Sequence, residues 1–155
     1  SCQLKGPLDV ELGYGELSFN PVPDGHKFKT YYGFQGGSHI YGALRVKNPA
    51  MDFPRLEVTF KLLDDDACEG AGGGSAYGND AQADTGTSSA CEPRRIGYRY
   101  GILGPNLHTN AAGQVEEAGI TIFHQNYGGG GADRLTLTIR DPCGRVGSVE
   151  RAVKD

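Results

Sequence analysis

The sequence predicts an all-β fold, an antiparallel β-sandwich, from three observations. Short segments alternate apolar and polar residues with a period of two, as half-buried strands do. Glycine accounts for 25 of the 155 residues, far above the usual share of about 7%, and most of it lies between these segments, where the chain must turn. No segment holds the helical spacing i, i+3, i+4 and i+7 of apolar residues over several turns, so helix should be minor.

Eight or nine short strands are expected along the chain. Two short pieces surround a kink within residues 10–19, and further alternating segments cover residues 26–34, 34–46, 56–62, 94–103, 116–125, 134–141 and 145–153. Side chains of one parity in a strand share one face. The parity predicted to face the core is that of Ile40, Gly42, Leu44 and Val46 in one strand, Leu56, Val58, Phe60 and Leu62 in the next, and Ile96, Tyr98, Tyr100 and Ile102 in a third.

One domain is expected to span residues 1–155, since the chain can build one core but is short for two. A long insertion is predicted at residues 64–92, rich in glycine, serine, alanine and aspartate. Apart from Cys68 and Tyr77 it holds almost no apolar residue larger than alanine, so it cannot bury enough surface to fold alone. It is therefore predicted to be a loop closed by a disulfide.

The four cysteines, Cys2, Cys68, Cys91 and Cys143, show no C-x-x-C spacing. An even number in a loop-rich chain favours disulfides and therefore an exported protein, in the periplasm, at the cell surface or secreted. Of the three possible pairings we prefer Cys68 with Cys91 and Cys2 with Cys143. Two alternatives remain open: reduced thiols in a cytosolic protein, and a bacterial lipoprotein acylated on Cys2, which would leave Cys143 single.

Two segments carry a resemblance to known proteins. Residues 135–146, Leu-Thr-Leu-Thr-Ile-Arg-Asp-Pro-Cys-Gly-Arg-Val, resemble the final hairpin of immunoglobulin-like modules of exported bacterial proteins. Residues 33–39, Gly-Phe-Gln-Gly-Gly-Ser-His, resemble a segment of uncharacterised exported proteins and lipoproteins of Gram-negative bacteria. The resemblance implies an immunoglobulin-like sandwich and export, and it transfers no activity. The chain lacks the tryptophan and the cysteine spacing of antibody domains.

Candidate binding residues lie around a diglycine hinge, Gly36 and Gly37, that leads into the strand ending at Val46. Tyr31 and Tyr41 have the outward parity of neighbouring strands, and tyrosine combines a large contact area with a hydrogen-bonding tip. The candidate binding set is His39, Tyr41, Tyr31 and Gln35. The alternative is that the tyrosines are ordinary cross-strand partners or cover a second core layer.

Two kinds of metal site are considered. A copper or zinc site would use His39 with His124, although the two have different parities and meet only if a bulge rotates one strand. The alternative is that each is a hydrogen-bonded structural histidine. Calcium would use carboxylates of the insertion, with Asp64, Asp66 and Asp80 as candidates, against the alternative of a solvated acidic loop.

Catalysis and nucleic-acid binding are not expected. Adjacent Ser38 and His39 on one strand point to opposite faces, and Ile40 stands where a Gly-x-Ser-x-Gly motif needs glycine. The net charge is −4, and no basic run is longer than two arginines. No leader segment opens the sequence, so a mature or trimmed form is expected.

The expected function is that of an exported, non-catalytic binding or structural module with an unknown protein or glycan ligand. Contact with a membrane is expected only through a lipid on Cys2. The alternatives are a copper or zinc protein that uses surface histidines, and a calcium-stabilised adhesion or carbohydrate-binding module.

Overall fold

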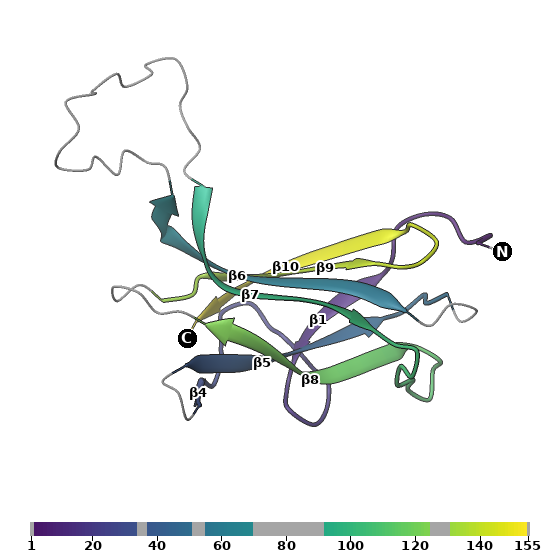
Figure 1. The fold of residues 1–155 in the computed structure, drawn as a ribbon, viewed down its shortest axis with the longest axis horizontal. Helices are drawn as coiled ribbons and strands as arrows, with labels where there is room; N and C mark the ends of the chain where they lie inside the picture. The colour runs from purple at the N-terminus through teal and green to yellow at the C-terminus, as the bar shows by residue number, and fades with distance from the viewer. Residues whose placement is uncertain (1, 34–36, 51–54, 70–91, 125–130, 155) are drawn as a thin grey trace, which may run out of the picture.

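The computed structural model describes residues 2–33, 37–50, 55–69, 92–124 and 131–154. Within these ranges every regular element is a strand, which confirms the all-β class (Figure 1). The strands are β1 (Val10–Tyr14), β2 (Asn20–Pro21), β3 (His26–Lys27), β4 (Tyr31–Tyr32), β5 (Ser38–Val46), β6 (Leu56–Glu69), β7 (Glu92–Leu103), β8 (Val115–His124), β9 (Arg134–Arg140) and β10 (Val146–Lys154). The described part of the chain contains no helix that could cross a membrane.

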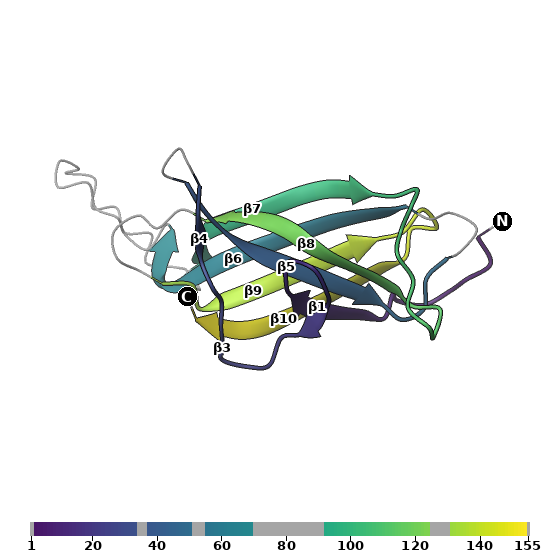
Figure 2. The ribbon, with the colours of Figure 1, turned by 90° about the horizontal axis from the view of Figure 1, so that it is seen from below.

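All ten described strands belong to one mixed sheet in the order β2-β1-β5-β8-β7-β6-β9-β10-β3, with β4 paired to β5. Each pairing is antiparallel except that of β10 with β3. The sheet curls into a half-barrel, so that β1, β5 and β8 lie across the core from β6, β9 and β10 (Figures 1 and 2). The backbone N–H of Leu8 donates to the carbonyl of Val146 at 3.2 Å and joins the β10 side to the segment before β1.

The described strands form this single curled sheet, and the immunoglobulin-like antiparallel sandwich that the sequence predicts is not confirmed. The two halves are connected because β7 and β8 pair at Gly97 with His124 and at Tyr98 with Phe123. Beyond these two pairs the strands have other neighbours, β6 for β7 and β5 for β8. The sequence does not predict that β7 and β8 are paired here, because two residue pairs require no residues other than those of any strand.

The core lies inside the curl and contains the predicted faces of β5 and β6. Leu44, Val46 and Phe60 have 0% exposure, and Ile40 has 1%. The ring of Phe60 reaches across the core to β5, where a Cβ added to Gly42 would lie 3.0 Å from its Cε1 atom. Glycine at position 42 therefore makes room for the ring that packs the two halves together.

The outward face of β7 corrects one prediction. The sequence predicts Tyr98, Tyr100 and Ile102 in the core, but their exposed fractions are 41%, 47% and 65%. The cause is a shift of register between Leu62 and Leu63 of β6, which places Ile96 out of step with the residues that follow it. The inner face beyond the shift is Gly97, Arg99, Gly101 and Leu103, opposite Leu62, Phe60, Val58 and Leu56.

The start of the predicted insertion, residues 64–92, is also corrected. Strand β6 continues to Glu69, and β7 already begins at Glu92. Asp64 is 1% exposed and accepts a hydrogen bond from Nη2 of its cross-strand partner Arg94 at 3.3 Å. The acidic residues therefore extend the strand, because a cross-strand arginine compensates a buried carboxylate. Residues 70–91 lie outside the described part of the chain.

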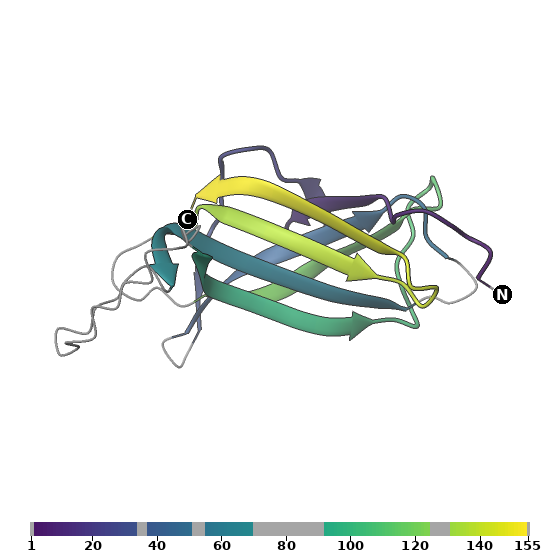
Figure 3. The ribbon, with the colours of Figure 1, turned by 90° about the horizontal axis from the view of Figure 1, so that it is seen from above.

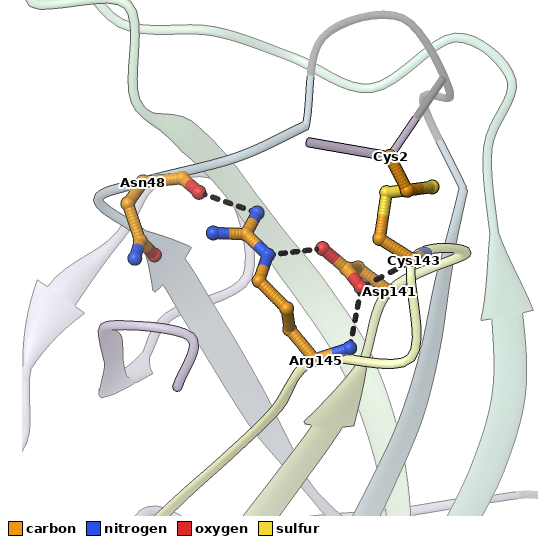
Figure 4. Close-up of a disulfide and its surroundings, with 5 residues drawn as sticks. All are labelled: Cys2, Asn48, Asp141, Cys143 and Arg145. Carbon is orange, nitrogen blue, oxygen red and sulfur yellow. Dashed lines mark hydrogen bonds and ion pairs between the residues drawn. A yellow bond between two sulfur atoms is a disulfide. The ribbon is translucent and has the colours of Figure 1, made fainter. Parts of the chain in front are cut away.

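A disulfide joins Cys2 to Cys143, as the sequence predicts, with a Cα–Cα distance of 5.3 Å (Figure 4). It ties the N-terminal segment to the turn between β9 and β10 across a separation of 141 residues. A lipid on Cys2 would be attached to the same Sγ atom that forms the disulfide. Lipidation of Cys2 and this disulfide therefore exclude each other. The predicted pair of Cys68 with Cys91 involves a cysteine outside the described residues.

Loss of this disulfide is expected to lower the free energy of unfolding by about 2–4 kcal/mol, because the bond restricts the unfolded chain over a long loop. The variant is Cys2→Ser with Cys143→Ser, compared with the oxidised protein by urea denaturation. A digest under non-reducing conditions should contain one peptide pair that joins the two cysteines. An unlinked Cys2 peptide in that digest would contradict the pairing.

Candidate functional site

Four aromatic side chains lie in register across four neighbouring strands. Tyr31 of β4 is opposite His39 of β5, His39 is opposite Phe123 of β8, and Phe123 is opposite Tyr98 of β7. Directly opposed residues share one face of a sheet and lie within side-chain contact. We call these four residues the aromatic row. It runs through the short connection between β7 and β8, which explains why the sequence alone does not indicate it.

At one end of the row, rings cover one another. Tyr31 stacks on His39 with centroids 5.6 Å apart and an interplanar angle of 17°. Tyr41 packs edge-on against both rings at 4.9 and 5.0 Å. The candidate binding residues Tyr31, His39 and Tyr41 are thus brought together, and all three are half-buried. The fourth candidate, Gln35, lies outside the described residues.

At the other end, the side chains are open to solvent. Phe123 is 59% exposed and lies opposite Tyr98, and Tyr100 and Ile102 continue on the same face of β7. We call these four residues the exposed patch. A shallow pocket of 220 Å³ lies between Phe123 of β8 and residues Arg95 to Tyr98 of β7. Sequence reasoning missed this patch, because parity alone placed the β7 side chains inward.

Basic side chains surround the exposed patch. The Arg95 guanidinium lies 4.5 Å from the centroid of the Tyr98 ring, and Lys61 is the cross-strand partner of Tyr98 on β6. Arg99 is also exposed, on the opposite face of β7 from Tyr98. Within the described part of the chain none of these three cations forms an ion pair with a carboxylate. The carboxylate of Glu57 lies near the far end of the patch, where its charge raises the pKa of the Tyr100 phenol.

The histidines of the proposed transition-metal site are not brought together. His124 is 6% exposed and lies opposite Ser38, whose Oγ donates to the His124 carbonyl at 3.0 Å. His39 is one position further along β5, so its side chain lies on the other face of the sheet. The bulge that would be needed to align them occurs at Gly42 to Leu44 instead.

Metal ligands from other residue types are also not grouped. Among the described residues, no three His, Cys, Asp or Glu side chains lie close enough to hold a metal ion. Of the calcium candidates, Asp64 faces Arg94, whereas Asp80 and the side chain of Asp66 lie outside the described part. The calcium alternative therefore stays a prediction.

A second surface pocket, of 320 Å³, lies between Leu17, Phe19 and Glu117. Its charged groups already have partners. Glu117 accepts a hydrogen bond from the backbone N–H of His108 at 2.6 Å and contacts the imidazole Nδ1 at 3.1 Å. Hydrogen bonds from Asn110 and then from Arg45 lower the pKa of Glu116, the other carboxyl in this pocket. The two carboxyl groups of this pocket are therefore engaged in contacts within the fold.

No family model, curated protein or solved structure matches the chain. The side chains themselves must therefore indicate the function. The described surface has one place where large apolar residues of neighbouring strands gather without cover, and that place is the exposed patch.

Proposed function

We propose that the chain is a non-catalytic module that binds a protein partner through the exposed patch. The observation that carries the proposal is the pair Phe123 and Tyr98, directly opposed at the junction of β8 and β7 and exposed by 59% and 41%. A cluster of large apolar side chains with a polar rim is typical of an interaction surface. Tyrosine, phenylalanine and arginine are also enriched at protein–protein interfaces.

A protein ligand fits the ring geometry better than a glycan. Sugars stack on the free faces of aromatic rings, but Tyr31 and His39 stack on each other with an angle of 17°. Arg95 occupies one face of Tyr98. The sequence contains no tryptophan, the ring with the largest stacking face. Phe123 with its charged neighbours is better suited to an apolar side chain of a partner, surrounded by polar contacts.

Export and an immunoglobulin-like relationship belong to the same proposal. The disulfide between Cys2 and Cys143 supports an oxidising compartment, since such bonds are rare in the cytosol. The resemblance of residues 135–146 to modules of exported bacterial proteins supports the same location. A binding module outside the cytosol is consistent with both.

The proposal predicts that the patch can be removed without loss of the fold. Phe123→Ser with Tyr98→Ser should change the free energy of unfolding by less than about 1 kcal/mol, because both side chains are largely exposed. Peptides selected from a random phage-displayed library on the unmodified protein should lose at least tenfold in affinity for this variant, about 1.4 kcal/mol.

The matched control is Leu17→Ser, which removes an apolar side chain that is 93% exposed outside the patch. It should bind the selected peptides as the unmodified protein does. Peptides that bind the double variant with unchanged affinity would refute the assignment of the patch. If the unmodified protein bound arrayed glycans and the double variant did not, the ligand of the patch would be a carbohydrate and not a protein.

A further inference from the structure

Over about half of its length, strand β7 pairs with a neighbouring strand on one side and not on the other. From Gly97 to Leu103 it pairs with β6 in continuous register, whereas β8 pairs with it only at Gly97 and Tyr98. Within the described residues, Arg99 to Leu103 therefore presents an unpaired backbone edge. Figure 3 shows β7 at the border of the layer that it forms with β6, β9 and β10.

This edge has one inward-parity charge, Arg99, but it lacks proline and bulges, which protect sheet edges in other proteins. Natural edge strands are short, or contain proline, inward charges or bulges, because an exposed regular edge pairs with other chains. The stretch from Tyr98 to Leu103 contains no proline, and the register shift of β6 lies before it. Its outer face carries Tyr98, Tyr100 and Ile102, so an added strand would also find apolar side chains beside it.

The inner face of the same stretch is open as well. A Cβ on Gly101 would meet no atom within 4 Å. Arg99 shares this face and is exposed, although its cross-strand partner Phe60 is 0% exposed. An added strand could therefore place side chains on both faces. Those on the inner face would find space at Gly101 and a positive charge at Arg99.

The charges along the edge indicate the kind of partner. Arg95, Arg99 and Lys61 are exposed cations without an ion pair among the described residues, in a chain whose net charge is −4. Acidic side chains on a partner would complement them. A second copy of β7 would instead bring the arginines of both copies, Arg94, Arg95 and Arg99, along one seam. Like charges across a strand pair are destabilising.

We infer that the edge of β7 from Arg99 to Leu103 accepts an extended acidic segment of a partner protein as an additional strand. The segment alternates: apolar side chains lie beside Tyr98, Tyr100 and Ile102, and an acidic side chain lies opposite Arg99. Backbone hydrogen bonds supply affinity in this mode of recognition, and the alternating side chains supply specificity. The inference rests on the proposed function and adds the conformation and charge of the partner.

The probe is a short fluorescein-labelled peptide of alternating valine and glutamate, with alternating valine and lysine as its control. Fluorescence anisotropy should show saturable binding of the glutamate peptide and at least tenfold weaker binding of the lysine peptide. Hydrogen exchange measured by NMR should show new protection at alternate backbone amides from Arg99 to Leu103. An added strand bonds to alternate residues of the edge, whereas contact through side chains alone protects none of them.

Arg99→Glu should weaken binding of the glutamate peptide by about tenfold, the loss expected when an attractive pair becomes repulsive. The control Arg140→Glu makes the same change at an exposed residue of β9, two strands away, and should leave the affinity unchanged. If Arg99→Glu perturbs the circular dichroism spectrum, Arg99→Gln removes the charge with a smaller change and should still weaken binding.

Several outcomes would overturn the inference. These are the absence of peptide binding, binding without protection of the β7 amides, and equal binding of the two peptides. Protection of the same amides in the free protein at high concentration would assign the edge to a second copy. The proposed function would survive each of these results if library-selected peptides still required Phe123 and Tyr98, so the two proposals fail separately.

Discussion

Replacement of Asp141 by alanine is expected to lower the free energy of unfolding by about 3–5 kcal/mol, because it leaves a buried charge without a partner. Asp141 and Arg145 are 4% and 6% exposed. Nε of Arg145 donates to Oδ2 of Asp141 at 2.8 Å, and Nη2 donates to the carbonyl of Asn48 at 2.8 Å (Figure 4). The carboxylate also accepts hydrogen bonds from the backbone N–H groups of Cys143 and Arg145.

The measurement is urea denaturation with the disulfide intact, compared with a second variant. Asp141→Ala combined with Arg145→Met removes both charges and should be more stable than Asp141→Ala alone, because no unpaired charge stays buried. Asp141→Asn should fall between the unmodified protein and Asp141→Ala, since the amide oxygen can still accept from the turn. A loss below about 1 kcal/mol in Asp141→Ala would mean that Arg145 reaches water in the variant.

Replacement of Phe60 by alanine is expected to cost about 3–5 kcal/mol, the range for a large aromatic side chain removed from a core. Phe60 is 0% exposed and lies on β6, opposite Leu137 of β9. Its ring reaches β5 at Gly42, where a Cβ added to the glycine would also meet the side chain of Ile122 on β8. Its removal would leave a cavity between the two halves of the curled sheet.

The contact with Gly42 gives this prediction a sharper test. A Cβ at position 42 would lie 2.8 Å from Cδ1 of Ile122 and 3.0 Å from Cε1 of Phe60. Gly42→Ala alone should therefore cost about 1–3 kcal/mol through overpacking. In the background of Phe60→Leu the same substitution should cost less, because the smaller side chain leaves room for the methyl group. Additive effects of the two substitutions would show that the ring and the glycine do not compete for space.

These two sites are expected to stabilise the fold, whereas the exposed patch is the surface proposed to bind a partner. Asp141, Arg145 and Phe60 are buried and have close partners on neighbouring segments. Phe123, Tyr98 and Arg99 are exposed and contribute little to the core. Substitutions of the first group should therefore change stability, and substitutions of the second should change binding.

Alternation in the sequence determines the all-β class and the buried faces of β5 and β6. Ile40, Leu44 and Val46 face the core, as do Leu56 to Leu62 at alternate positions. The alternation predicts these two faces correctly because it continues without interruption along each strand. The register shift between β5 and β8, at Gly42 to Leu44, leaves the β5 residues on both sides of it buried. The disulfide between Cys2 and Cys143 is the pairing that we preferred for these cysteines among three possible pairings, although the sequence left reduced thiols and an acylated Cys2 open.

Tertiary structure alone decides the face of β7, the aromatic row and the unpaired edge. One shift of register beside Leu62 turns Tyr98, Tyr100 and Ile102 to solvent, and nothing in their alternation marks it. The row requires Tyr31, His39, Phe123 and Tyr98 to be paired across strands far apart in the sequence. Periodicity determines which side chains share a face within a strand, whereas register between strands determines which faces meet and which edge remains open.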